Sequence, residues 1–147
     1  MNPLDRIREW LNTYKGFDRL QDLRVDYYSQ QPDNGSIDPS GAQVISITEN
    51  IIGTKTVDMQ YNFGLYFVLA KDPGDDNTAA DNAAWVMEFQ RWVNEQSILR
   101  LAPTFGDVPR NETMKAQNGS VMAADSEGVA IYMVQLSVNF TKIYEVI

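Results

Sequence analysis

The sequence has no cysteine and no histidine in its 147 residues. The absence of cysteine excludes disulfides, thiolate nucleophiles and thiolate metal ligands. The absence of histidine removes the commonest general base and the commonest metal ligand. Serine–histidine catalysis, cysteine–histidine catalysis and histidine-containing zinc sites are therefore excluded within this chain. We expect no catalytic residue and no metal site.

Long apolar runs and basic clusters are also missing. No apolar run reaches the roughly 20 residues that cross a membrane, and the first residues lack the basic-then-apolar pattern of a signal peptide. Lysine and arginine number 12 against 20 aspartate and glutamate, so the formal net charge is −8. An acidic chain repels nucleic acid and anionic membranes, so we expect neither to be a binding partner.

Phosphate-binding loops and catalytic carboxylate pairs leave no clear trace either. The glycine spacings of the Rossmann and P-loop motifs do not occur, so we expect no cofactor. Asp72, Asp75 and Asp76 lie close together, but no apolar pocket is implied around them. A general acid needs burial that raises its pKa, so an enzyme that uses carboxylates alone is the weakest function class.

The longest pattern that is present covers residues 57–69, where every odd position is apolar. Side chains alternate between the two faces of a strand, so this pattern predicts one long strand with a continuous core face. Residues 44–52 predict a preceding strand, joined to it at Gly53 and Thr54 as an antiparallel hairpin. Residues 132–141 predict a final strand of similar length, which we expect to pair with the long strand or lie near it.

Two amphipathic helices are predicted. The first begins at Asn2 and Pro3, carries an apolar stripe as far as Tyr14, and has Gly16 as its expected C-terminal cap. The second covers about residues 79–97, after a capping residue at Thr78. Its apolar arc is wider than one sheet face requires. Either the helix is simply well buried, or its aromatic edge meets a partner subunit.

The remaining segments predict shorter features. We expect a short strand at residues 23–27, a loop at residues 30–41, and an ordered loop at residues 98–109. Residues 112–124 predict a hairpin that turns at Asn118 and Gly119. The whole chain, residues 1–147, is then one α+β domain: an antiparallel sheet of about four to five strands with two main helices packed on one face.

Four stretches of the sequence carry a resemblance to a known class of protein. They are residues 2–11 (Asn-Pro-Leu-Asp-Arg-Ile-Arg-Glu-Trp-Leu), 60–67 (Gln-Tyr-Asn-Phe-Gly-Leu-Tyr-Phe), 100–107 (Arg-Leu-Ala-Pro-Thr-Phe-Gly-Asp) and 132–141 (Tyr-Met-Val-Gln-Leu-Ser-Val-Asn-Phe-Thr). With them the chain resembles the minor capsid and tail completion proteins of tailed bacteriophages and prophages. Its overall plan is similar to that of tail terminator proteins, and the resemblance spans nearly the full chain.

The resemblance implies a structural virion protein, assembled in the host cytoplasm, that forms a hexameric ring at the head-proximal end of the tail. Such a ring caps the tail tube, joins tail to head, and contacts the tube protein and the head–tail connector proteins. DNA passes through its lumen without specific binding, which a negative lumen would favour by repulsion. It implies no catalytic residue, no cofactor, no metal and no membrane. Two alternatives stay open: a head-closure or tail-tube subunit, and a small non-catalytic binding module.

A ring also requires surfaces where subunits meet. Aromatic residues and arginine are enriched in such interfaces. We therefore expect subunit contacts at the wide edge of the second helix, in the following loop, and on the exposed side of the long strands. The expected interface residues are Trp85, Arg91, Trp92, Pro103 and Phe105.

Overall fold

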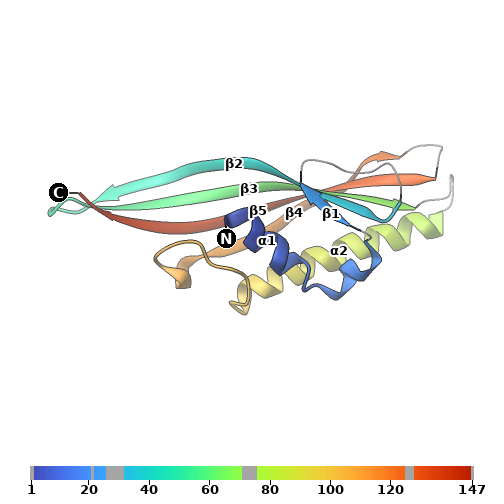
Figure 1. Ribbon diagram of the computed structural model, residues 1–147, viewed down its shortest axis with the longest axis horizontal. Helices are drawn as coiled ribbons and strands as arrows, with labels where there is room; N and C mark the ends of the chain where they lie inside the picture. Colours follow the sequence, from blue (N-terminus) through green and yellow to red (C-terminus); the bar gives the residue numbers. More distant parts are fainter. Residues whose placement is uncertain (1, 21, 26–31, 71–75, 125–127, 147) are drawn as a thin grey trace.

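The computed structural model of the protein describes residues 2–20, 22–25, 32–70, 76–124 and 128–146. Its elements, in chain order, are α1 (Pro3–Leu11), the 3-10 helix η1 (Lys15–Arg19), β1 (Leu23–Val25), β2 (Asn34–Glu49), β3 (Thr54–Ala70), α2 (Asp76–Ile98), the 3-10 helix η2 (Pro109–Asn111), β4 (Thr113–Ala124) and β5 (Val129–Glu145). The five strands form one sheet in the order β1-β2-β3-β5-β4. Only β1 and β2 are parallel; the other neighbours are antiparallel. The predicted α+β class is confirmed, with both helices on one side of the sheet (Figure 1).

The two long strands at the centre of the sheet are paired as predicted. Strands β3 and β5 run antiparallel in unbroken register from Thr54 opposite Glu145 to Ala70 opposite Val129. The odd positions of β3 from Phe63 onward are buried beneath the helices. The alternation in the sequence therefore identifies the core face correctly over this part of the strand.

The helix layer closes the core over that face. Asn2 caps α1, since its side-chain oxygen accepts a hydrogen bond from the Asp5 amide at 2.8 Å. In α2, the side chains at Val86, Phe89 and Val93 are fully buried. Their spacing of three and four residues places them on one helical stripe, and each buried side chain of this size contributes about 1.5–3 kcal/mol.

The first helix ends earlier than predicted. It stops at Leu11, and Asn12 rather than Gly16 is its C-terminal cap. The Thr13 and Tyr14 amides each donate to a carbonyl three residues back, which tightens the chain into turns that lead to η1. This change of direction brings the Tyr14 ring against Trp92, at a centroid distance of 4.9 Å.

The predicted loop at residues 30–41 is wrong over residues 34–41, which belong to β2. Proline and glycine indicate a loop by local preference, but β2 lies at the edge of the sheet once β1 ends opposite Ile37. An edge strand tolerates Pro39, because an outward-facing amide has no partner to lose. The pairing with β3 then shifts between Pro39 and Ala42, which accommodates Gly41 at a φ of 89°.

The predicted hairpin at Asn118 and Gly119 is also wrong. Strand β4 continues through both residues, which lie between Gln117, opposite Gln135, and Ser120, opposite Met133. Two residues on β4 therefore face one on β5, which is a β-bulge. The positive φ that favours Asn in a hairpin turn is present, at 59° for Asn118, but it serves the bulge.

Other predicted boundaries differ by a few residues or fall elsewhere. Helix α2 begins at Asp76, so Thr78 lies inside it and is not its cap. The ordered loop after α2 is confirmed, with η2 at its end. Asp72, Asp75 and the end of the predicted strand, residues 26–27, lie outside the described residues.

Candidate interaction surface

The sheet is longer than the helices that cover it. At about 3.3 Å per residue the 17 residues of β3 span about 55 Å, whereas the 23 residues of α2 span about 35 Å at 1.5 Å per residue. The hairpin end of β2 and β3, together with the end of β5, projects past the helix layer (Figure 1). We call this projection, residues 42–56 and 142–146, the arm.

The arm is rich in exposed branched aliphatic side chains. Ile51 and Ile52, at its tip, are 104% and 79% exposed. The other large exposed apolar residues of the arm are Val44, Ile45, Ile47, Ile143, Tyr144 and Val146. Scattered exposed apolar residues are normal on a protein, but a group this dense at one end of a sheet marks a surface for contact with another molecule.

The tip of the arm is a well-formed turn. The Asn50 side-chain oxygen accepts hydrogen bonds from the Ile52 amide at 3.1 Å and the Thr54 amide at 3.0 Å. The Asn50 amide in turn donates to the Thr54 carbonyl at 3.1 Å. Gly53 takes a φ of 89°, which a branched side chain would resist. The two isoleucines are thus held in fixed positions with their side chains in solvent.

A second exposed apolar patch lies where α2 ends. Ile98, Leu99 and Leu101 are each more than half exposed. The chain turns there with Arg100 at a φ of 59°, and the Leu101 amide donates to the Gln96 carbonyl at 2.8 Å. We call these three residues the α2-end patch.

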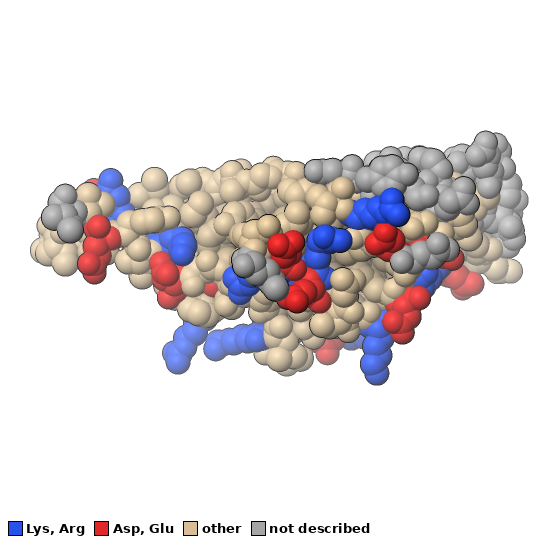
Figure 2. All heavy atoms as spheres, in the orientation of Figure 1, with Lys and Arg blue, Asp and Glu red and all other residues tan. Residues whose placement is uncertain are grey.

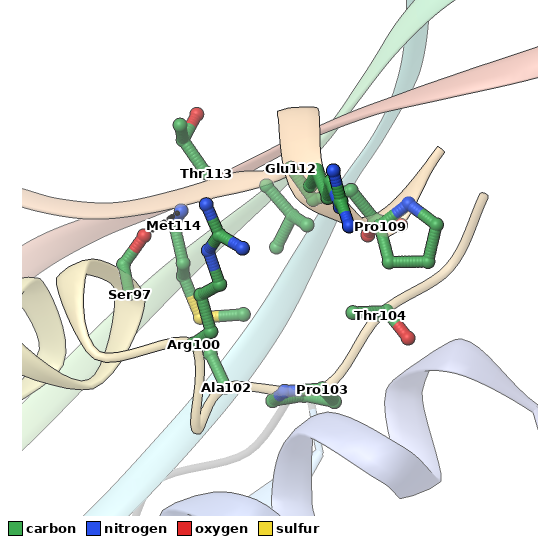
Figure 3. Close-up of a pocket in the computed structure, with 11 residues that line it drawn as sticks. Ser97, Arg100, Ala102, Pro103, Thr104, Pro109, Glu112, Thr113 and Met114 are labelled. Atoms are coloured by element: carbon green, nitrogen blue, oxygen red, sulfur yellow. Dashed lines mark hydrogen bonds between the residues drawn. The ribbon is translucent and has the colours of Figure 1, made fainter. Parts of the chain in front are cut away.

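A pocket of about 190 Å³ opens beside the α2-end patch (Figure 3). It lies between the end of α2, the loop of residues 99–111 and β4. Its shape depends on Glu112, whose two carboxylate oxygens accept from the Phe105 amide at 2.7 Å and the Gly106 amide at 3.0 Å. The lining is mainly aliphatic and proline surface, with two arginines: Ser97, Arg100, Ala102, Pro103, Thr104, Pro109, Arg110, Glu112, Thr113, Met114 and Val138.

One edge of the sheet is covered by side chains and loop. The Met114 amide on β4 donates to Ser97 Oγ at 2.9 Å, and the Ala116 amide donates to Asn94 Oδ1 at 3.2 Å. Beyond the start of β4, Asp107 bonds to the exposed backbone of β5. Its amide donates to the Thr141 carbonyl at 2.7 Å, and its carboxylate accepts from the Ile143 amide. Helix α2 and this loop therefore protect the β4 side of the sheet from strand addition.

The opposite edge, β2, is protected in another way. It carries Pro39 and two register shifts, between Pro39 and Ala42 and between Val44 and Ser46. Prolines and bulges interrupt the row of free amides and carbonyls that a new strand would need. Because both edges are guarded, the arm is suited to contact through its side chains, not through backbone pairing.

Around Gln60, the face of the sheet turned away from the helices is polar, whereas toward the other end of β3 and β5 it carries a small buried apolar cluster of Val68, Val129 and Ile131. Gln43 donates to Gln60 at 2.7 Å, and Gln60 donates to Asn139 at 2.8 Å, so amide side chains connect three strands. Nearby, Asp58 accepts from Thr141 at 2.7 Å and from Ser46 at 2.9 Å. These hydrogen bonds, first the one from Thr141, lower the pKa of the Asp58 carboxyl.

The predicted interface residues on α2 are largely engaged within the chain. Trp92 stacks on Trp10 with ring centroids 4.9 Å apart, and Trp85 donates from its indole nitrogen to the Gly16 carbonyl at 3.2 Å. Both tryptophans are only partly exposed and pack against the core. Arg91 is exposed and pairs along the helix with Glu88 and Glu95. A role in subunit contact stays a prediction for all three.

The predicted residues in the loop have different surroundings. Pro103 lines the pocket. The ring of Phe105 meets Tyr61 edge-on at 5.8 Å, and the Arg6 guanidinium lies over it at 4.6 Å. Phe105 therefore packs the loop against the sheet, whereas Pro103 forms part of the pocket wall. Their predicted role at an interface likewise stays a prediction.

The arm residues were not singled out one by one from the sequence. The sequence predicted a strand over residues 44–52, and in the structure Ile45, Ile47 and Ile51 from this segment are each more than half exposed. The lengths of the predicted elements would have indicated the arm. A hairpin of two strands of this length is longer than a helix of 19 to 23 residues, so the helix cannot cover all of it. The exposed side of the long strands was nonetheless among the expected contact surfaces.

Other kinds of site leave no mark on the described residues. Within them, no group of three or more acidic side chains is placed to hold a metal ion. None of the described helices is long and apolar enough to cross a membrane. The chain matches no protein-family model, and no curated protein matches it significantly.

Proposed function

We propose that the chain is a structural subunit of a tailed-phage particle. In this proposal it assembles as a ring at the head-proximal end of the tail, caps the tail tube and joins the tail to the head. The observation that carries the proposal is the aliphatic arm, which the chain's own helices do not cover. The resemblance to tail completion and tail terminator proteins supplies the setting and the expected partners, the tube protein and the head–tail connector proteins.

The placement of the exposed surfaces supports the proposed ring. The arm and the α2-end patch are different surfaces of one chain, both apolar and both unpartnered within the described residues. A contact between unlike surfaces repeats from copy to copy, and it closes into a ring when the rotation between copies divides a full turn. The resemblance sets the proposed ring size at six.

The charge of the chain suits this role. A net charge of −8 makes specific DNA binding unfavourable, so DNA passes through the proposed ring without being held. A structural role of this kind requires no catalytic group, cofactor or metal, and we assign none. We place the protein in the virion tail, after assembly in the host cytoplasm.

The test is the absolute mass of the purified protein by light scattering, over a range of concentrations and at two salt levels. A single closed oligomer, above all a hexamer, supports the ring. Growth without limit favours a tail-tube subunit of the same particle, because a tube subunit repeats its contacts without a stop. A monomer that also fails to bind purified tail tubes rules out the proposed role.

A second candidate is a small non-catalytic binding module. The pocket beside the end of α2 favours it, because it is concave, mainly apolar and carries arginines at its mouth. At about 190 Å³ it is smaller than the usual ligand pocket of about 300 Å³ or more. A stable monomer that binds a small carboxylate or a peptide with the pocket intact would favour this candidate.

A further inference from the structure

We propose that the tip of the arm, Ile51 and Ile52, of one copy docks in the pocket beside the end of α2 of the next copy. This inference deepens the proposed function, and it rests on that function in taking a second copy of the chain as the partner. It names both halves of the subunit contact. The sequence did not indicate that the tip and the pocket contact each other.

The tip has the properties of a ligand for a pocket. Two neighbouring isoleucines are exposed at the end of a rigid turn, so little conformational entropy is lost when they are buried. In Figure 1 the hairpin turn lies beyond the 99–111 loop, so the length of the arm separates the tip from the pocket of its own chain. The contact therefore has to be made with another copy.

The pocket has the properties of a receptor for aliphatic side chains. Ala102, Pro103, Pro109 and Met114 give it apolar walls, and the α2-end patch extends that surface outward. Glu112 holds the loop in place through two backbone amides, so the cavity exists before any partner arrives. Preformed cavities that receive an apolar anchor are typical of the centres of protein interfaces.

Charge also matches the two surfaces. Arg100 and Arg110 line the pocket, and neither pairs with an acidic side chain among the described residues. Figure 2 shows basic side chains projecting at the lower edge of the molecule, where the 99–111 loop lies. Near the tip, the charged residues without an ion pair in the described chain are the acids Glu49 and Glu145 and the base Lys55. These residues give the tip a net charge of −1, and Arg100 and Arg110 together with Glu112 give the pocket a net charge of +1. The opposite signs favour this orientation of two copies.

The two protected edges of the sheet also favour docking through side chains over strand addition. Strand addition along β2 would have to pass Pro39 and two bulges, and the β4 edge is already bonded to α2. Docking of a turn into a pocket needs neither edge. It also leaves the polar face of the sheet in water, where its amide side chains bond to one another across the strands.

Cysteine cross-linking tests the contact directly, because the natural chain has no cysteine to interfere. Ile52→Cys and Thr104→Cys are prepared as separate full-length proteins, mixed in equal amounts and oxidised. We expect a disulfide-linked dimer of the two variants, formed several-fold faster than in a mixture of Ile52→Cys with Val121→Cys. Val121 is the matched control, since it is exposed on β4 but does not line the pocket. A yield in the test mixture no higher than in the control overturns the docking.

Assembly measurements on folded variants give an independent check. Ile52→Asp should weaken the association constant about tenfold or more, whereas Met87→Asp, at an exposed apolar position on α2 outside the tip and the pocket, should not. Glu49→Arg should weaken association, and adding Arg100→Glu to that variant should restore part of it. Loss of association in both aspartate variants alike, or no loss in either, overturns the inference.

The outcomes separate this inference from the proposed function. A closed oligomer of the natural protein with no tip-to-pocket cross-link leaves the ring standing and removes the docking. A cross-link in a protein that grows into open chains keeps the docking and removes the ring terminator. If the natural protein is monomeric in dilute solution, the cross-link at raised concentration still decides for or against the docking.

Discussion

The same two strands, β3 and β5, run through two different environments. Under the helices, Phe63, Leu65 and Phe67 of β3 are at most 6% exposed. In the arm, Ile143 and Tyr144 of β5 are 45% and 48% exposed, and Val44 and Ile47 of the neighbouring strand β2 are more than half exposed. The pairing between β3 and β5 is equally regular in both parts. The difference teaches that an apolar strand face indicates a need for a cover, without indicating whether the cover belongs to the same chain.

The two regions also differ in the kind of apolar side chain they use. The covered region is built on aromatic rings: Phe17 lies within 6.0 Å, centroid to centroid, of Phe67, Trp85 and Phe89. The arm uses mainly isoleucine and valine. Aromatic rings in mutual contact have preferred packing geometries, which suits the core of a single chain. Branched aliphatic side chains favour extended strands, which suits the arm.

The largest expected effect separates the two regions by stability. Phe67→Ala, in the covered region, should lower the free energy of unfolding by about 3–5 kcal/mol, because it leaves a cavity among buried rings. Ile47→Ala, in the arm, should change it by less than about 0.5 kcal/mol, because the side chain is already in water. Urea unfolding of both variants at low protein concentration measures the difference. Similar losses for the two would show that the arm is covered within the single chain.

A smaller effect is expected where α2 approaches β4. A side chain on Gly119 would place its first carbon 2.8 Å from Val86 Cγ1 and would collide with the Gln90 side chain. Gly119→Val should therefore destabilise the protein by about 1–3 kcal/mol through overpacking. Asn118→Gly is the control in the same bulge, and it should be tolerated because glycine accepts the positive φ of that position. Thermal unfolding of the pair checks this, and equal stability of the valine variant and the natural protein would contradict it.

The smallest effect concerns the polar face at the base of the arm. Hydrogen bonds from Thr141 and Ser46 hold the pKa of Asp58 below its ordinary value of 3.8. A carboxyl with a lowered pKa in the folded state adds stability above that ordinary value, and the contribution is lost as the pH falls through the folded pKa. Thr141→Val should raise the pKa of Asp58 toward 3.8, and Ser46→Ala should raise it less. An NMR titration of the Asp58 carboxyl measures both, and an unchanged pKa in Thr141→Val would contradict the assignment.

Prediction from the sequence succeeded where a pattern was long. The alternation over residues 57–69 and residues 132–141 identified β3 and β5, which were expected to pair or lie near each other and do pair, and the amphipathic pattern over residues 79–97 identified α2. Prediction failed at short sequence motifs that are compatible with two different local structures. Asn118 and Gly119 serve a bulge as well as a turn, and Pro39 fits an edge strand as well as a loop.

The candidate interaction surface was likewise predicted only in part from the sequence. Trp85 and Trp92 were expected at an interface because such residues are enriched there, but the same rings are well suited to a core, and both pack against it here. The exposed isoleucines were visible in the sequence as strand residues only. Their exposure depends on where the helix layer stops, which involves segments far apart along the chain.

The sequence by itself determined the two main helices, the long strands β3 and β5, the α+β class and the absence of thiol and imidazole chemistry, because each depends on residue type and local period. Only the tertiary structure decided which apolar residues are covered. Burial is set by the relative lengths and placement of helix and sheet, and β3 is longer than α2. It likewise decided that Pro103 and Met114, which lie on different segments, line one pocket, and that Ile51 and Ile52 are exposed at the tip of the arm.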